Sequence, residues 1–141
     1  MDRQLGGMRM GAALYIVVNS ATPGYETFVN GKVLSRTEDR HAAAAEKAGV
    51  RPLMHFFSMS RDEAETAAEE FGLPEDAVTE AGDEQWFDPE DGLKTVRALL
   101  SQLERNPESL GGDVRGELLE FEAVLTQAKE HGHLWHLSVD Y

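Results

Sequence analysis

The chain has 141 residues, of which 41% are hydrophobic and 28% charged, as in a single globular domain. It contains no cysteine, which excludes a disulfide framework, a thiol nucleophile and a cysteine-based zinc site. Its 26 acidic and 13 basic side chains give a formal net charge of −13, which repels nucleic acid and anionic membranes. No apolar run approaches the roughly 20 residues that a membrane span requires.

The first eleven residues are expected to form a flexible leader before a single domain of residues 12–141. Arg3 and Arg9 precede an apolar run at residues 12–18, which is the order of parts in a secretory signal. The run has only the minimum length for such a signal and lacks a well-formed cleavage site, so a cytoplasmic location is expected by default. Three methionines could begin translation: Met1, Met8 and Met10.

Strands are predicted near the start of the domain. Residues 14–18 are β-branched, aromatic or aliphatic and carry no charge, which is typical of a strand buried on both faces. Asn30 and Gly31 favour a tight turn, and they separate two short segments, residues 25–29 and 32–34. The sequence therefore predicts a short hairpin there.

Two helices are predicted in the middle of the chain, each preceded by a capping-box pattern. Ser35 and Glu38 form the first pattern, and its helix ends at Gly49. Ser60 and Glu63 form the second, and its helix ends at Gly72. The apolar residues 53–59 between the two helices are interpreted as a core strand or a buried connector.

Two more helices are predicted in the last third. Asp88 fits the N-cap of the first and Pro89 its first helical position, and apolar residues then recur at helical spacing up to Asn106. The second helix is predicted to begin at residues 111–113 and to close at Gly132.

The chain ends with apolar and polar residues in alternation from Trp135 to Tyr141, which predicts a strand with one apolar and one polar face. The predicted fold is therefore α+β. We expect a small, mainly antiparallel sheet that pairs the N- and C-terminal strands and is covered by about four helices. The sheet should contain Tyr15, Phe28, the segment around Leu53, and Trp135.

The segment from Asp62 to Asp91 contains thirteen acidic residues and no Lys or Arg, whereas the rest of the chain balances at 13 and 13. A field of this kind attracts basic surfaces, although helix starts also collect acids because of the helix dipole. We predict a non-catalytic protein that binds a cationic partner, in the first place a protein, in a regulatory, inhibitory or immunity-type role. For Trp86 the core is the favoured interpretation, and an interface anchor ringed by acids is the alternative. The candidate contacts are Glu69, Glu70, Asp83, Glu84 and Trp86.

His131, His133 and His136 fall within six residues, and imidazole is a common ligand of zinc, copper and nickel. In a strand, however, His133 and His136 point to opposite faces, so helix-cap and sheet-surface histidines are the alternative. His136 and Asp140 share the polar face and are candidates for general-base chemistry, without an evident nucleophile. The alternative function is therefore a small metal-binding protein or hydrolase that uses His133 and His136 with nearby carboxylates.

The chain lacks the motifs that announce a bound cofactor or nucleotide. There is no Walker A motif, no GxGxxG that opens a helix, and no HExxH pair, so no cofactor is predicted. No basic face is available for nucleic acid. The sequence leaves open the oligomeric state and the identity of any partner.

Overall fold

The protein is described here by a computed structural model, which covers residues 12–72 and 84–140. The predicted leader, residues 1–11, and the candidate contact Asp83 lie outside these residues. The elements are β1 (Ala13–Val18), α2 (Lys32–Arg36), α3 (Glu38–Ala48), the 3-10 helix η1 (Leu53–Phe56), α4 (Arg61–Phe71), α6 (Pro89–Arg105), α7 (Arg115–Glu130) and β2 (Trp135–Asp140).

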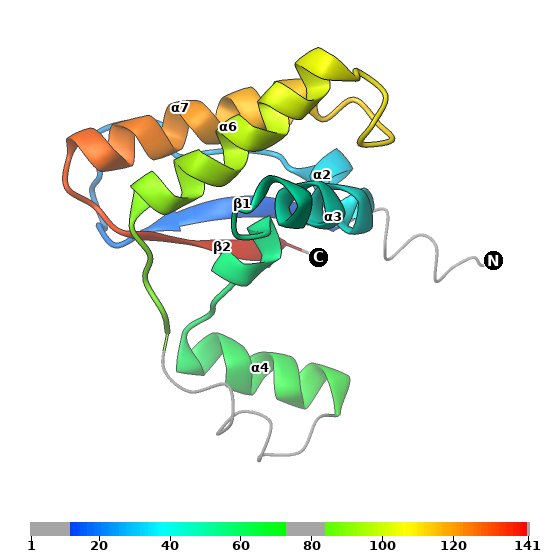
Figure 1. Cartoon of the computed structure of the whole chain (residues 1–141). Coiled ribbons are helices and arrows are strands. Elements are labelled where there is room, and N and C mark those ends of the chain that lie inside the picture. The colour runs from blue at the N-terminus through cyan, green and yellow to red at the C-terminus, as the bar shows by residue number, and fades with distance from the viewer. Residues whose placement is uncertain (1–11, 73–83, 141) are drawn as a thin grey trace.

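The two strands form an antiparallel sheet in which the N- and C-terminal ends of the domain meet. Ala13 lies opposite Asp140 and Val18 opposite Trp135. The helices α6 and α7 cover one face of this sheet, and α4 lies on the other side (Figure 1). The predicted α+β fold, with paired terminal strands, is confirmed.

The core lies between the sheet and the helices that cover it. Leu14 and Ile16 of β1 and Trp135 and Leu137 of β2 are buried together with the apolar stripes of α6 and α7. Burial of this apolar surface is the main driving force for the fold. At Gly92 in α6, an added Cβ would lie 2.4 Å from the Trp135 ring, so glycine is required for the helix to approach the sheet this closely.

The helix α6 begins and ends where the sequence predicts. The Asp88 side chain accepts a hydrogen bond from the Glu90 backbone N–H at 2.9 Å, and Pro89 occupies the first turn. The helix ends at Arg105. The next helix, α7, begins at Arg115 rather than at residues 111–113, because Gly111 takes a positive φ of 79° within the connecting turn.

The predicted hairpin around Asn30 and Gly31 is wrong. Gly31 has a φ of −91° and precedes the helix α2. The Glu117 carboxylate of α7 accepts hydrogen bonds from the backbone N–H groups of Val33 at 3.0 Å and Leu34 at 2.8 Å. A side chain more than 80 residues away therefore supplies the helix cap that the local sequence lacks.

The first predicted capping box is also wrong. Ser35 lies inside α2, and α3 begins at Glu38 after Thr37, whose side chain makes no cap hydrogen bond. The Thr37 hydroxyl instead donates to the Val33 carbonyl oxygen at 2.8 Å. The predicted end of this helix is confirmed, since Gly49 takes the left-handed conformation with a φ of 76°.

Two segments expected in the sheet are not strands. Residues Leu53–Phe56 form a 3-10 helix with Leu53 and Phe56 fully buried, and only Phe57 then pairs with Leu137 as an isolated bridge. This segment is thus the buried connector that the sequence analysis left open. Phe28 lies in no strand and is 71% exposed.

The helix α4 stands apart from the rest of the domain (Figure 1). It packs closely against none of the other described helices or strands, although Ala64 and Ala68 on one of its faces are buried. It ends before Gly72, which has a φ of 67°, as predicted. Among the described helices, none combines the length and apolar composition that a bilayer crossing requires.

Candidate functional site

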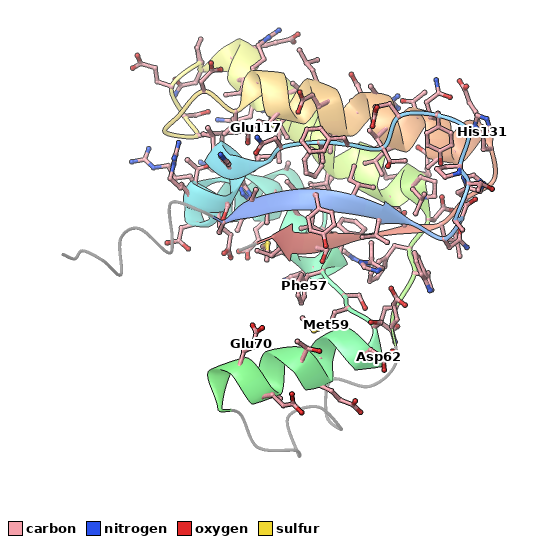
Figure 2. All side chains as sticks on the ribbon, turned by 180° about the vertical axis from the view of Figure 1, so that it is seen from behind. Phe57, Met59, Asp62, Glu70, Glu117 and His131 are labelled. Carbon is pink, nitrogen blue, oxygen red and sulfur yellow. The ribbon has the colours of Figure 1, made fainter. Side chains whose placement is uncertain are left out.

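The acidic surface of α4 is made by Asp62, Glu65, Glu69 and Glu70, all of which are exposed. At 100° per residue, Asp62, Glu69 and Glu70 occupy the half of the helix that faces away from Ala64 and Ala68, and Glu65 lies at the border of that half. Asp62 and Glu70 mark its two ends (Figure 2). Within residues 12–72 and 84–140, none of the four carboxylates has an ion-pair partner.

Glu69 and Glu70 lie at the end of α4, where the helix dipole is negative and disfavours further negative charge. The other long helices have a basic residue in the last turn, namely Lys47 in α3, Arg105 in α6 and Lys129 in α7. The last turn of α4 has none. The helix dipole can therefore explain Asp62 in the first turn but not Glu69 and Glu70.

Other acids of the segment from Asp62 to Asp91 make contacts within the domain. Asp88 caps α6, and the Glu90 carboxylate pairs with the Lys129 ammonium on α7. This ammonium holds the pKa of Glu90 below its ordinary value. Glu84 binds His136. The described acids between Asp62 and Asp91 therefore form two groups: those that contact other parts of the domain, and those on α4, which have no ion-pair partner among the described residues.

His136 lies on the predicted polar face of β2, for which a histidine at the sheet surface was one alternative. It is not a surface residue, because His136 is 0% exposed and Ser138 only 4%. The Glu84 carboxylate lies 2.6 Å from His136 Nε2, and the half-buried Trp86 ring lies over the imidazole with the ring centroids 4.8 Å apart. The chain before α6 thus covers this face of the sheet.

Both ring nitrogens of His136 are engaged. Nδ1 lies 3.0 Å from the Leu137 carbonyl oxygen, which can only accept a hydrogen bond, so Nδ1 donates. Nε2 lies within hydrogen-bonding distance of the Glu84 carboxylate. This arrangement holds residues 84–87 against the sheet, and both imidazole nitrogens are already occupied by partners within the protein.

Asp140 and His136 lie at opposite ends of β2. Asp140 pairs with Ala13 and His136 with Val17 in the strand register. The carboxylate that binds His136 is that of Glu84, which comes from the segment before α6. The sequence predicts an acid from a neighbouring element beside His136, and Glu84 is that acid.

His131 and His133 belong to a separate cluster with Tyr25. The Tyr25 hydroxyl lies 2.7 Å from His133 Nδ1, and the Tyr25 and His131 ring centroids are 4.7 Å apart. His131 caps α7, and its Nδ1 lies 2.8 Å from the Gln127 carbonyl oxygen. Burial raises the pKa of Tyr25. The sequence did not indicate Tyr25 as a member of this cluster, because its hydrogen-bond partner His133 lies 108 residues away.

The three clustered histidines therefore do not converge. Across the described parts of the chain, no group of three or more His, Cys, Asp or Glu side chains is arranged to hold a metal ion. Comparison with protein-family models, with curated proteins and with solved structures found no match for this chain. Its function therefore has to be argued from its own surfaces.

Proposed function

We propose that the chain is a binding protein whose α4 acidic surface engages a cationic partner protein. The observation that supports this most directly is the pair Glu69 and Glu70: both are exposed, neither has an ion-pair partner among the described residues, and the helix dipole opposes their charge. Positive side chains of a partner would offset two unfavourable interactions. One is the repulsion between the carboxylates, and the other is their repulsion by the negative end of the helix dipole.

The energetics favour recognition by several weak contacts. An exposed ion pair contributes about 0.2–1 kcal/mol, so four carboxylates give modest affinity but strong attraction during the encounter. Screening by salt weakens such attraction over about 8–10 Å at physiological ionic strength. Binding at α4 should therefore depend strongly on salt, and a regulatory, inhibitory or immunity-type role is compatible with that behaviour.

The alternative, metal or hydrolytic chemistry at His133 and His136, has less geometric support. His133 pairs with Tyr25, while His136 is buried and bonded through both nitrogens. A hydrolase that used His136 would first have to displace Glu84. We therefore keep this function as the second prediction.

Affinity capture from the native host with three bait proteins tests the proposal. The baits are the wild-type chain, the double variant E69K/E70K on α4, and the double variant E104K/E130K. The last two change the net charge by the same amount, because Glu104 and Glu130 are exposed acids in the last turns of α6 and α7. We expect a basic protein to be retained by the wild type and by E104K/E130K, and lost from E69K/E70K.

Measuring the affinity of the captured protein at two salt concentrations completes the test. A rise from 0.05 to 0.3 M salt should weaken wild-type binding at least about tenfold. Equal retention by E69K/E70K and the wild type, or an affinity that salt leaves unchanged, would contradict the role of α4.

A further inference from the structure

The two edges of the sheet differ. Beyond β2, Phe87 exchanges backbone hydrogen bonds with Trp135 at 2.7 and 3.0 Å, and the Ser58 N–H donates to the Leu137 carbonyl oxygen at 3.1 Å. Beyond β1, Leu14 is the one residue that pairs with another described segment, with Gly31 at 3.2 and 2.9 Å. Among the described residues, the edge of β2 is therefore covered, and that of β1 is covered at one residue.

The alternation along the strand identifies the backbone N–H and carbonyl groups of β1 that have no hydrogen-bond partner at this edge among the described residues. Since Leu14 directs its N–H and carbonyl groups outward to Gly31, Ile16 and Val18 direct theirs to the same edge. Within the described residues, neither makes a backbone hydrogen bond on that side. An unpaired strand edge is a template for another strand.

The neighbouring segment does not fill this edge because its own N–H groups bond elsewhere. The Phe28 N–H donates to the Glu26 carboxylate at 3.0 Å, and the Asn30 N–H faces the Glu120 carboxylate at 3.4 Å. This segment, which leads into α2, runs beside β1 (Figure 2). An open groove of about 640 Å³ lies between the two.

The groove is mainly apolar. Tyr15 and Ile16 of β1 line one side, and residues 27–30 with the exposed Phe28 ring line the other, while Lys32 provides the charge at one end. The strand itself contains no charged residue and no proline, which are the usual means of protecting an edge. The groove thus combines the outward backbone N–H and carbonyl groups of β1 with the aromatic rings of Tyr15 and Phe28.

We propose that this groove binds an extended segment of a partner protein, which adds to the sheet as a strand beside β1. The segment pairs with the outward N–H and carbonyl groups of Ile16 and Val18. It places an apolar side chain against Tyr15 and Phe28, and an acidic group near Lys32. A single extended chain fits because residues 27–30 wall the groove, whereas β1 of a second copy would bring its own wall into the same space.

Selection from a library of displayed random seven-residue peptides tests the proposal. The full-length wild-type chain serves as the target, and V18P serves for counter-selection. Proline at Val18 removes an outward N–H that makes no bond to β2, and edge strands tolerate such a proline. V18A is the matched control, because it shortens the side chain but keeps the N–H.

We expect enrichment of peptides with alternating apolar residues, which bind the wild type and V18A but at least about tenfold more weakly to V18P. F28A should weaken binding more than F28L. In amide-exchange NMR, the signals of Ile16 and Val18 should become protected when an enriched peptide is added. E69K/E70K should bind these peptides as the wild type does, so the test is independent of α4.

A synthetic version of the enriched peptide provides a test that leaves the protein unaltered. Methylation of a peptide N–H that faces β1 should lower the affinity about tenfold, while methylation of the next N–H along the peptide, which points away, should not. Failure to enrich peptides over V18P, or equal binding of the two methylated peptides, would overturn the proposal. A homodimer of the wild type that V18P disrupts would overturn it too, because the occupant would then be a second copy.

Discussion

Acidic side chains have opposite roles on the helix pair α6–α7 and on the helix α4. On α6 and α7, Glu90 pairs with Lys129, and Glu122 accepts from Arg97 at 3.2 Å. Glu117 reaches from α7 to cap α2. On α4 the described carboxylates form no ion pair, and the helix packs closely against none of the other described helices or strands.

This difference indicates which acids serve the fold and which are available to a partner. A carboxylate that satisfies backbone N–H groups stabilises the domain, whereas exposed like charges on one helix face oppose it slightly. Substitutions should therefore be costly in the packed region and nearly neutral on α4. The following predictions test that contrast, from the largest expected effect to the smallest.

Gly92→Ala should cause the largest loss of stability. The new Cβ would lie 2.4 Å and 2.9 Å from atoms of the buried Trp135 ring, so α6 must move away from the sheet. We expect the free energy of unfolding to fall by about 3 kcal/mol in chemical denaturation. Gly116→Ala in α7 is the control, since its Cβ meets no atom within 4 Å, and it should stabilise by up to about 1 kcal/mol. Equal stability of G92A and the wild type would contradict this packing.

Glu84→Ala should remove the carboxylate that lies within hydrogen-bonding distance of the fully buried His136. The orphaned imidazole should lower the free energy of unfolding by about 2 kcal/mol. Glu65→Ala on α4 is the matched control and should change it by less than about 0.5 kcal/mol, because Glu65 is exposed. Similar results for the two variants, measured by urea denaturation, would remove the contrast between the regions.

Glu117→Ala should expose the uncapped start of α2. Loss of the hydrogen bonds to Val33 and Leu34 should cost about 1 kcal/mol in thermal or chemical unfolding. Glu120→Ala provides a comparison one turn along α7, because its contact to the Asn30 N–H is longer, at 3.4 Å. A larger effect at Glu120 than at Glu117 would argue against the cap.

His41 should make the packed region sensitive to acid. Its Nε2–H donates to the Leu34 carbonyl oxygen at 2.8 Å, and Nδ1 has no partner among the described residues. Burial lowers the pKa of His41 from its ordinary value of 6.5. The unfolded chain therefore takes up the proton first as the pH falls below 6.5, and the stability decreases by at most about 1.4 kcal/mol per pH unit.

The variant His41→Gln isolates this contribution, because the glutamine amide can donate to Leu34 without titrating. Denaturation of both proteins between pH 7.5 and 5 should show a smaller loss of stability in H41Q, after its lower stability at pH 7.5 is subtracted. Parallel pH profiles would show that His41 is not the group responsible.

The smallest effect is expected on α4 itself. Glu69→Gln with Glu70→Gln removes two negative charges from the end of a helix that has no basic residue there. We expect α4 to gain a few tenths of a kcal/mol per substitution, seen as slower amide exchange within the helix. E104Q/E130Q is the control, and its gain should be smaller because Arg105 and Lys129 already balance those helix ends. Faster exchange in E69Q/E70Q would mean that these acids stabilise α4.

The sequence by itself determined the elements whose signals are local. Asp88 and Pro89 mark the start of α6 because a cap and a fixed φ act within one turn. The alternation in β2 and the apolar run in β1 identify the two strands, and the charge count locates the acidic region. Gly49 and Gly72 end their helices because only glycine adopts a positive φ at little cost.

Only the tertiary structure decided the features that depend on distant partners. Asn30 and Gly31 precede a helix rather than a turn, because Glu117 supplies the cap from α7. The polar face of β2 is buried, because Glu84 and Trp86 cover His136. The same holds for the acids, since whether a carboxylate is engaged or free depends on which side chains the fold brings to it, and no local pattern contains that information.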